Sequence, residues 1–296
     1  MSFGVEVKNE LCRTAVSRRC CAQAEAYGVL LYCNSFNERQ ARIVTESEAF
    51  ARRLPVLFKK AFKLTFDCLP QGGGKQVFSI TEPGKLAILH QSFGSDPGAL
   101  ALHVNFAVLE ERCCRAAFLR GAFLAGGSVT DPRKGYHLEL ATSHHSVSRE
   151  VLALMRELDQ EPKSAQRKGN SVIYFKQSDK IEDFLTCTGA PLAAMEVMNA
   201  KLERDLRGKV NRRVNCDAAN LDKAVEAAMA QVEAIRRLEK AGTLITLPDK
   251  LREVAALRAA HPEDTLAQLA ERCSPPITKS ALNHRLRKLV ELGRKS

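Results

Sequence analysis

The hydrophobic pattern of the chain contains one unit twice. Residues 25–36 (EAYGVLLYCNSF) form an apolar run that ends in small polar residues, and residues 118–129 (FLRGAFLAGGSV) have the same character. Gly28 corresponds to Gly121, at an offset of 93 residues. Self-similarity at a fixed offset predicts two copies of one supersecondary unit.

The segments that follow each apolar run also correspond. Alternating residues predict strands, and helical spacing of apolar residues predicts amphipathic helices. The expected strands are residues 41–46 and 76–80 in copy one, and 136–142 and 171–176 in copy two. The expected helices are residues 49–61 and 84–91 in copy one, and 148–158 and 180–186 in copy two.

Each copy is therefore predicted to be α-β-β-α-β-β-α, although one strand of each pair is weakly marked. The predicted fold class is α+β, a pseudo-twofold saddle made of the two repeats. The glycine-bearing helices are expected to pack against each other at its centre, because glycine lets helix backbones approach closely.

The residues after the repeats are predicted to be helical. One helix is expected over 191–207, where proline suits the first turn, and another from Asp217 to Gly242. Residues 209–216 (KVNRRVNC) interrupt the pattern between them. The predicted organisation is a saddle domain over 1–200, with repeats at about 20–95 and 113–190, a basic linker over 201–220 and a helical domain over 221–296.

The C-terminal residues predict a helix-turn-helix. A helix over 249–260 is followed by Thr265 and Gln268, whose spacing forms a capping box for a short helix over 266–272. A Pro-Pro turn follows, and Thr278 is a plausible N-cap for a third helix running to about residue 292. In a helix-turn-helix this third helix lies in the major groove of DNA.

One face of the third helix is predicted to pack into the hydrophobic core, and the opposite face is predicted to be exposed. Leu282, Leu286 and Leu289 recur at helical spacing. The opposite face and the first turn carry residues suited to phosphates or base edges, with asparagine and arginine suited to bidentate contacts. The candidate DNA-binding residues are Thr278, Lys279, Ser280, Asn283, His284, Arg285, Arg287 and Lys288, with Asn283 and His284 as candidates for base readout. The alternative is a solvated charged helix face.

Charge adds to this picture. The net charge is +11 and the pI is near 9.3, which favours a polyanionic partner such as double-stranded DNA, although solubility alone is the alternative. Residues 201–296 carry 20 basic against 13 acidic residues. Arg212 and Arg213 in the predicted linker would contact phosphates or belong to a solvated connector. Basic residues of the saddle could face a groove or be scattered surface charge.

The ten cysteines and the N-terminus bear on cellular location. No CxxC occurs and no Cys/His block has zinc spacing. The N-terminus has no apolar signal region and no run approaches a membrane span, so we expect a cytoplasmic protein at the nucleoid with no membrane partner. Reduced thiols there are expected to be mostly small buried apolar groups, and the pairs Cys20-Cys21 and Cys113-Cys114 are expected to serve packing rather than redox chemistry.

The repeated helix resembles the motif of the LAGLIDADG homing endonucleases. LRGAFLAGG (119–127) and AYGVLLYCN (26–34) align over its nine positions. In that family, the acid at the eighth position of each copy holds the metal for phosphodiester cleavage. Here the eighth positions are Cys33 and Gly126, which offer no hard anionic oxygen for Mg²⁺. We therefore expect no metal, no cofactor and no catalysis, and we expect Asp131 to be a turn residue.

A degenerate double LAGLIDADG domain followed by a helix-turn-helix is similar to the WhiA family of bacterial regulators. The resemblance also rests on NRRVNCDAAN (211–220) and SALNHRLRKL (280–289). It implies a sequence-specific regulator in sporulation and differentiation, or in cell division and chromosome segregation. The saddle would then be a second surface for DNA or for another regulator protein. The alternatives are an architectural nucleoid protein, recognised by flat affinity across sequences, and an active endonuclease.

Overall fold

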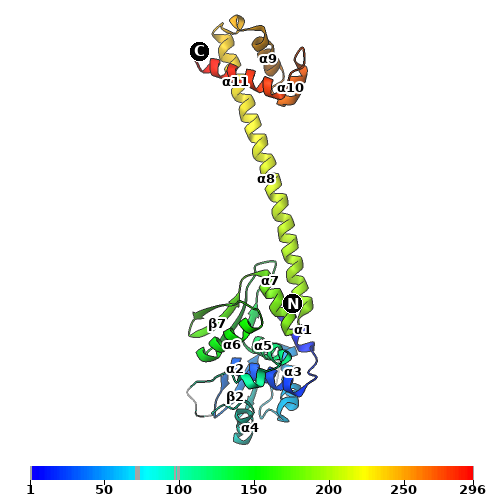
Figure 1. Cartoon of the computed structure of the whole chain (residues 1–296), viewed down its shortest axis with the longest axis vertical. Coiled ribbons are helices and arrows are strands. Elements are labelled where there is room, and N and C mark those ends of the chain that lie inside the picture. The colour runs from blue at the N-terminus through cyan, green and yellow to red at the C-terminus, as the bar shows by residue number, and fades with distance from the viewer. Residues whose placement is uncertain (1, 71–73, 97, 99–100, 296) are drawn as a thin grey trace. The chain divides into compact units, whose positions relative to one another are not determined.

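The computed structural model describes residues 2–70, 74–96, 98 and 101–295 of the chain (Figure 1). It divides into two compact units, Met1–Arg204 and Asp205–Ser296. Each unit buries a hydrophobic cluster of its own, as is typical of separate domains.

The centre of the first unit is a pair of tightly packed helices, α2 (Arg19–Tyr32) and α5 (Arg112–Gly126). They contain the two apolar runs, and the two glycines meet the facing backbone. A Cβ atom on Gly28 would lie 2.1 Å from the carbonyl oxygen of Phe118, and one on Gly121 would lie 2.0 Å from that of Glu25. The expected packing of the glycine-bearing helices is confirmed, because only a hydrogen atom fits between them.

Two antiparallel sheets flank this pair. The first has the order β1-β2-β3 and the second the order β4-β5-β7-β6. The strands are β1 (Ser35–Phe36), β2 (Ala41–Thr45), β3 (Gln76–Ile80), β4 (Gly127–Val129), β5 (Leu138–Thr142), β6 (Lys163–Arg167) and β7 (Asn170–Phe175). Side chains alternate between the core and solvent along β2, which matches the period-two pattern of its sequence.

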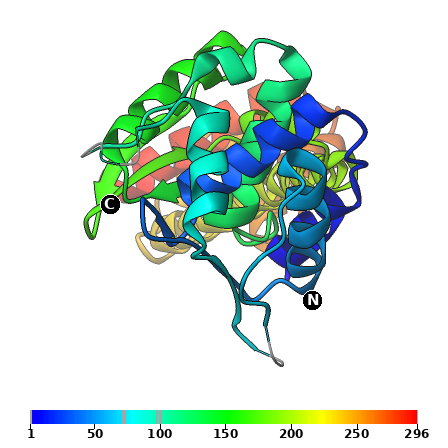
Figure 2. The ribbon, with the colours of Figure 1, turned by 90° about the horizontal axis from the view of Figure 1, so that it is seen from below.

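The α+β fold class is confirmed, and the second repeat has all seven predicted elements, α5-β4-β5-α6-β6-β7-α7. In the first repeat, the described residues contain three strands. The segment before residue 71 runs alongside β3 (Figure 2), where Cys68 and Ser79 form an isolated bridge in place of a second strand pair. The weak marking of that strand in the sequence corresponds to this reduced pairing.

Further helices complete the first unit. They are α1 (Phe3–Arg13), α3 (Glu48–Phe62), α4 (Pro83–Phe93), the 3-10 helix η1 (Phe106–Leu109), α6 (His145–Glu157) and α7 (Ser178–Thr188). The side chain of Ser47 caps α3 by accepting a hydrogen bond from the backbone N–H of Phe50 at 3.4 Å. Such a cap satisfies one of the free N–H groups at a helix start.

The predicted break at residues 209–216 is wrong. Helix α8 (Pro191–Lys240) runs through it without interruption. The valines and asparagines there cost about 0.7 kcal/mol each at most relative to alanine, whereas proline costs about 3 kcal/mol, and the segment contains no proline. The carboxylate of Glu10 caps the start of α8, accepting from the backbone N–H groups of Leu192 and Ala193 at 2.7 and 2.9 Å.

The second unit ends in three short helices, α9 (Asp249–Ala260), α10 (Leu266–Arg272) and α11 (Lys279–Lys295), after the 3-10 helix η2 (Leu244–Thr246). The predicted bounds of α9 and α10 are confirmed, and both halves of the Thr265–Gln268 capping box are formed. Among the described residues, no helix combines the length and apolarity that a membrane span requires.

Candidate nucleic-acid interface

The orientation of α11 is fixed by a row of leucines. Leu282, Leu286 and Leu289 are completely buried against α9, α10 and the end of α8. At the far end of the helix, a Cβ atom on Gly293 would lie 2.7 Å from the carbonyl oxygen of Ala234, so α11 crosses α8 with almost no gap. Helix α11 is therefore held at both ends, and its opposite face is free.

The turn between α10 and α11 is held by polar contacts. The hydroxyl of Thr278 accepts a hydrogen bond from the backbone N–H of Ala281 at 3.2 Å, which confirms Thr278 as a cap. The backbone N–H of Ile277 donates to the carbonyl of Ala270 at 3.0 Å, and that of Ser274 donates to the Glu253 carboxylate at 2.7 Å. These bonds fix the angle between the two helices, which decides whether α11 fits a groove.

Arg258 holds the turn on the other side of α10. Its side chain is only 2 % exposed, and one guanidinium nitrogen donates to the carbonyl oxygen of Asp264 at 2.8 Å. Desolvation lowers the pKa of Arg258, although the negative charges of Asp264 and Glu263 act in the opposite direction. The Asp264 carboxylate pairs with Arg272 at 2.7 Å. No pattern in the sequence indicated this role, since Arg258 stands among ordinary helical residues.

Most of the predicted DNA-binding residues come together on the free face of α11. The exposed ones are Thr278, Lys279, Ser280, His284, Arg287 and Lys288, and Arg285 is half-buried. In the part of the chain that the structure describes, the basic side chains of α11 from Lys279 to Lys288 form no ion pair with a carboxylate. Their positive charge is therefore uncompensated, as expected of a surface that meets phosphates.

Asn283 lies at the edge of this face. It is half-buried and lines a hollow of about 960 Å³ in the second unit, beside Arg258 and Thr265. Much of the rest of its wall is formed by α8, with apolar residues such as Leu221 and Met229 beside polar ones such as Glu233. The His284 side chain is therefore more exposed than that of Asn283 and more accessible to a base.

Arg212 and Arg213 are not part of the same cluster. Both are exposed on α8, and Ile235, the first α8 residue in the core of the second unit, lies 22 residues beyond Arg213. At 1.5 Å per residue, that separation is about 33 Å along the helix. Any phosphate contact of this pair is therefore separate from those of α11.

The two motif positions that carry acids in the homing endonucleases, Cys33 and Gly126, offer no ligand suited to Mg²⁺ in this chain. A Cβ atom on Gly126 would lie 2.6 Å from the carbonyl oxygen of Ala141 and 3.0 Å from the Tyr32 ring, so no carboxylate fits there. The thiol of Cys33 donates to the carbonyls of Leu30 and Ser35 at 3.1 and 3.2 Å, and burial raises its pKa to about 12. A glycine has no side-chain ligand, and a thiol is a soft ligand that does not suit Mg²⁺.

A cation already occupies the end of α5. The ammonium of Lys8 donates to the carbonyl oxygen of Leu124 at 3.2 Å, two residues before Gly126. Burial is the main cause that lowers the pKa of Lys8. A lysine at the end of a helix stabilises the free carbonyls there, and its charge would repel a metal ion. The Asp131 carboxylate accepts from the backbone N–H of Arg133 at 2.9 Å, which confirms Asp131 as a turn residue.

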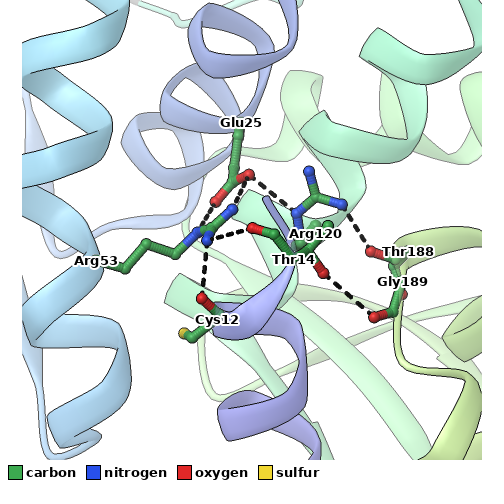
Figure 3. A network of polar contacts seen from close by, with 7 residues as sticks. All are labelled: Cys12, Thr14, Glu25, Arg53, Arg120, Thr188 and Gly189. Atoms are coloured by element: carbon green, nitrogen blue, oxygen red, sulfur yellow. Dashed lines mark hydrogen bonds and ion pairs between the residues drawn. The ribbon is translucent and has the colours of Figure 1, made fainter. Parts of the chain in front are cut away.

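A buried charge network joins the two central helices (Figure 3). Glu25 on α2 is completely buried and pairs with Arg53 of α3 at 2.5 Å and with Arg120 of α5 at 2.9 Å. Arg53 also donates to the carbonyls of Cys12 and Thr14, and Arg120 to that of Thr188. The network therefore connects α1, α3, both central helices and the end of α7. Its sequence signal is a charged residue inside each apolar motif helix.

These features define a class of protein, a LAGLIDADG-like saddle without metal-binding carboxylates that is followed by a helix-turn-helix domain. A family model described as the WhiA LAGLIDADG-like domain matches residues 115–207, and one described as the WhiA C-terminal HTH domain matches residues 210–293.

Relatives match almost the whole chain. A protein of Ruminiclostridium cellulolyticum is 38% identical, over 99% of this chain and 97% of its own length. One of Alkaliphilus metalliredigens is 36% identical, over 99% and 98%. Both are called probable cell division protein WhiA. The chain belongs to the WhiA family.

Solved structures agree on the fold. The crystal structure of full-length WhiA from Thermotoga maritima has a TM-score of 0.62 at 23% identity, covering 100% of this chain and 99% of that one. The structure of an N-terminal LAGLIDADG domain of WhiA has a TM-score of 0.50 at 20% identity, covering 64% and 90%. These two likenesses support the fold described above.

Proposed function

We propose that this protein is a sequence-specific regulator of transcription that binds double-stranded DNA through α11. The observation that carries the proposal is the exposed basic face of α11, which has no carboxylate partner among the described residues, while its leucine face is completely buried. Lys279, Arg287 and Lys288 contact phosphates or base edges, and His284 and Asn283 read bases. The names of the relatives support a role in cell division, and sporulation and differentiation genes are further proposed targets.

The saddle is then a second surface for DNA or for another regulator protein, and the protein acts at the nucleoid in the cytoplasm. Arg212 and Arg213 add phosphate contacts along α8, whose charge and exposure suit this role. Sequence specificity separates this function from that of an architectural nucleoid protein, which would bind unrelated fragments with equal affinity.

The double variant Arg287→Ala/Lys288→Ala tests the role of α11. We expect it to weaken binding of the full chain to a selected genomic fragment by about 10- to 100-fold. Each lost phosphate contact should also lower the salt slope by about 0.9. The measurement is fluorescence anisotropy at two salt concentrations.

The matched control for this variant is Arg294→Ala/Lys295→Ala, two basic residues at the end of the same helix. Lys295 pairs with Glu291 at 3.1 Å, so part of this charge is already compensated. Equal loss of affinity in both double variants would mean that net charge alone drives binding, and the assignment of α11 as the reader would be wrong.

We propose that the protein is not a nuclease. The double variant Cys33→Asp/Gly126→Asp introduces acids at the positions where the homing endonucleases carry them. It should still cleave no DNA in Mg²⁺, because residue 126 has no room for a side chain and the Lys8 ammonium lies at the end of α5. The measurement is plasmid nicking. Cleavage by the wild type that is lost in Asp131→Ala would instead support the endonuclease.

A further inference from the structure

The four cysteines at the starts of the central helices form a cluster across the pseudo-twofold axis. Cys20 and Cys21 lie in the first turn of α2, and Cys113 and Cys114 lie in the first turn of α5, at the same offset of 93 residues as the glycines. The sulfur atoms of Cys20, Cys21 and Cys114 lie within 4.8 Å of one another. The thiol of Cys113 is outside this group of three, although it lies near enough to interact with the thiols of Cys21 and Cys114.

Packing does not account for this cluster. The ten cysteines were expected to be mostly buried, but Cys20 and Cys113 are exposed and Cys21 is half-buried, while Cys114 is buried. A cysteine that serves as a small apolar group is normally inside. Two exposed thiols at equivalent positions of two repeats, each beside a further thiol, point instead to ligands.

We propose that Cys20, Cys21, Cys113 and Cys114 bind one zinc ion, which joins the two repeats at the starts of α2 and α5. Four thiolates in tetrahedral array are a standard structural zinc site. Zn–S bonds of about 2.3 Å place the sulfurs about 3.8 Å apart, so the three grouped thiols close on an ion with small side-chain rotations, and the Cys113 side chain turns further to complete the tetrahedron. That space suits a single ion rather than a cluster of several irons and sulfides.

The electrostatic surroundings favour such a complex. Zinc with four thiolates carries a net charge of −2, and two helix N-termini present partial positive charge and free N–H groups to it. Neither α2 nor α5 has a side-chain cap at its start, so these N–H groups are available to sulfur.

The cluster is separate from the former catalytic positions. Cys33 and Gly126 lie at the opposite ends of the same helices, and 13 residues separate Cys20 from Cys33. At 1.5 Å per residue this is about 20 Å. The ion would therefore be structural, and its signal was missed because the ligands lie in adjacent pairs 93 residues apart rather than at the spacing of a local zinc motif.

The test is metal binding by the full chain, stripped with a chelator under reducing conditions and titrated with Zn²⁺ and Co²⁺. We expect one ion per chain, the intense visible absorption of tetrahedral cobalt thiolate, and a melting temperature that rises with zinc. Cys20→Ser and Cys113→Ser change exposed residues, and each should weaken zinc binding by more than about 100-fold. Losing a residue that only supports a ligand weakens metal binding by about 10- to 100-fold, so a larger loss indicates a direct ligand. Cys68→Ser, also exposed, is the matched control and should bind as the wild type does.

Two results would overturn the proposal. In the first, the reduced chain takes up no zinc, and the cluster is then not a metal site. This conclusion holds even if oxidation links α2 to α5 by a disulfide. In the second, both serine variants bind zinc as tightly as Cys68→Ser does. Because Cys20 and Cys113 are exposed, circular dichroism of these variants should match that of the wild type, so lost binding would not reflect misfolding.

Discussion

Replacing Glu25 by alanine should destabilise the first unit by about 3–5 kcal/mol, because the change leaves two guanidinium groups buried without a counter-charge. Arg53 and Arg120 are 8 % and 7 % exposed, so water cannot replace the lost carboxylate. Glu25→Gln keeps the shape and one acceptor oxygen and should cost less. For a unit of this size, the loss lowers the melting temperature by about 10 °C.

The comparison that isolates burial is Glu38→Ala. Glu38 also pairs with an arginine, Arg39, at 3.5 Å, but both side chains are exposed. An exposed pair contributes about 0–1 kcal/mol, so this variant should unfold near the wild-type temperature. The measurement is thermal and urea unfolding of the full chain. Similar stabilities for Glu25→Ala and Glu38→Ala would show that the buried network does not stabilise the fold.

The sequence predicted the elements of the fold well where periodicity alone decides them. Residues 76–80 and 249–260 were placed to the residue, because alternation and helical spacing are strong there. It failed at residues 209–216, where low helix propensity resembled a break although nothing prevents a helix. The propensities of valine and asparagine are weak effects, and a helix capped at its start by Glu10 and packed at its end through Ile235 continues across them.

The site was predictable to the extent that it lies in one segment. The leucine row of α11 and the cap by Thr278 follow from local spacing. Contacts that join distant segments could not be predicted in this way. Glu25 meets Arg120 across 95 residues, and Lys8 meets Leu124 across 116. The partner in each case is decided by how the two repeats pack, which no window of sequence contains.

Gly121→Ala should destabilise the first unit by about 3 kcal/mol or more, although it adds a single methyl group. The added Cβ would lie 2.0 Å from the carbonyl oxygen of Glu25 and 2.9 Å from its carbonyl carbon. These atoms belong to the helix backbone and cannot rotate away, so α2 and α5 must move apart by about 1 Å. Overpacking of a dense core typically costs 1–3 kcal/mol. Here the separation also strains the bonds of Glu25 to both arginines.

Gly208→Ala provides the opposite expectation within the same chain. Gly208 lies inside α8, and a Cβ atom there would meet nothing within 4 Å. Alanine is better than glycine in a helix interior by about 1 kcal/mol, so this variant should be at least as stable as the wild type. The measurement is thermal unfolding, which compares the melting temperatures of Gly121→Ala and Gly208→Ala with that of the wild type. If Gly121→Ala melts together with Gly208→Ala, then the close approach of the two motif helices is not what selects glycine at the centre of the saddle.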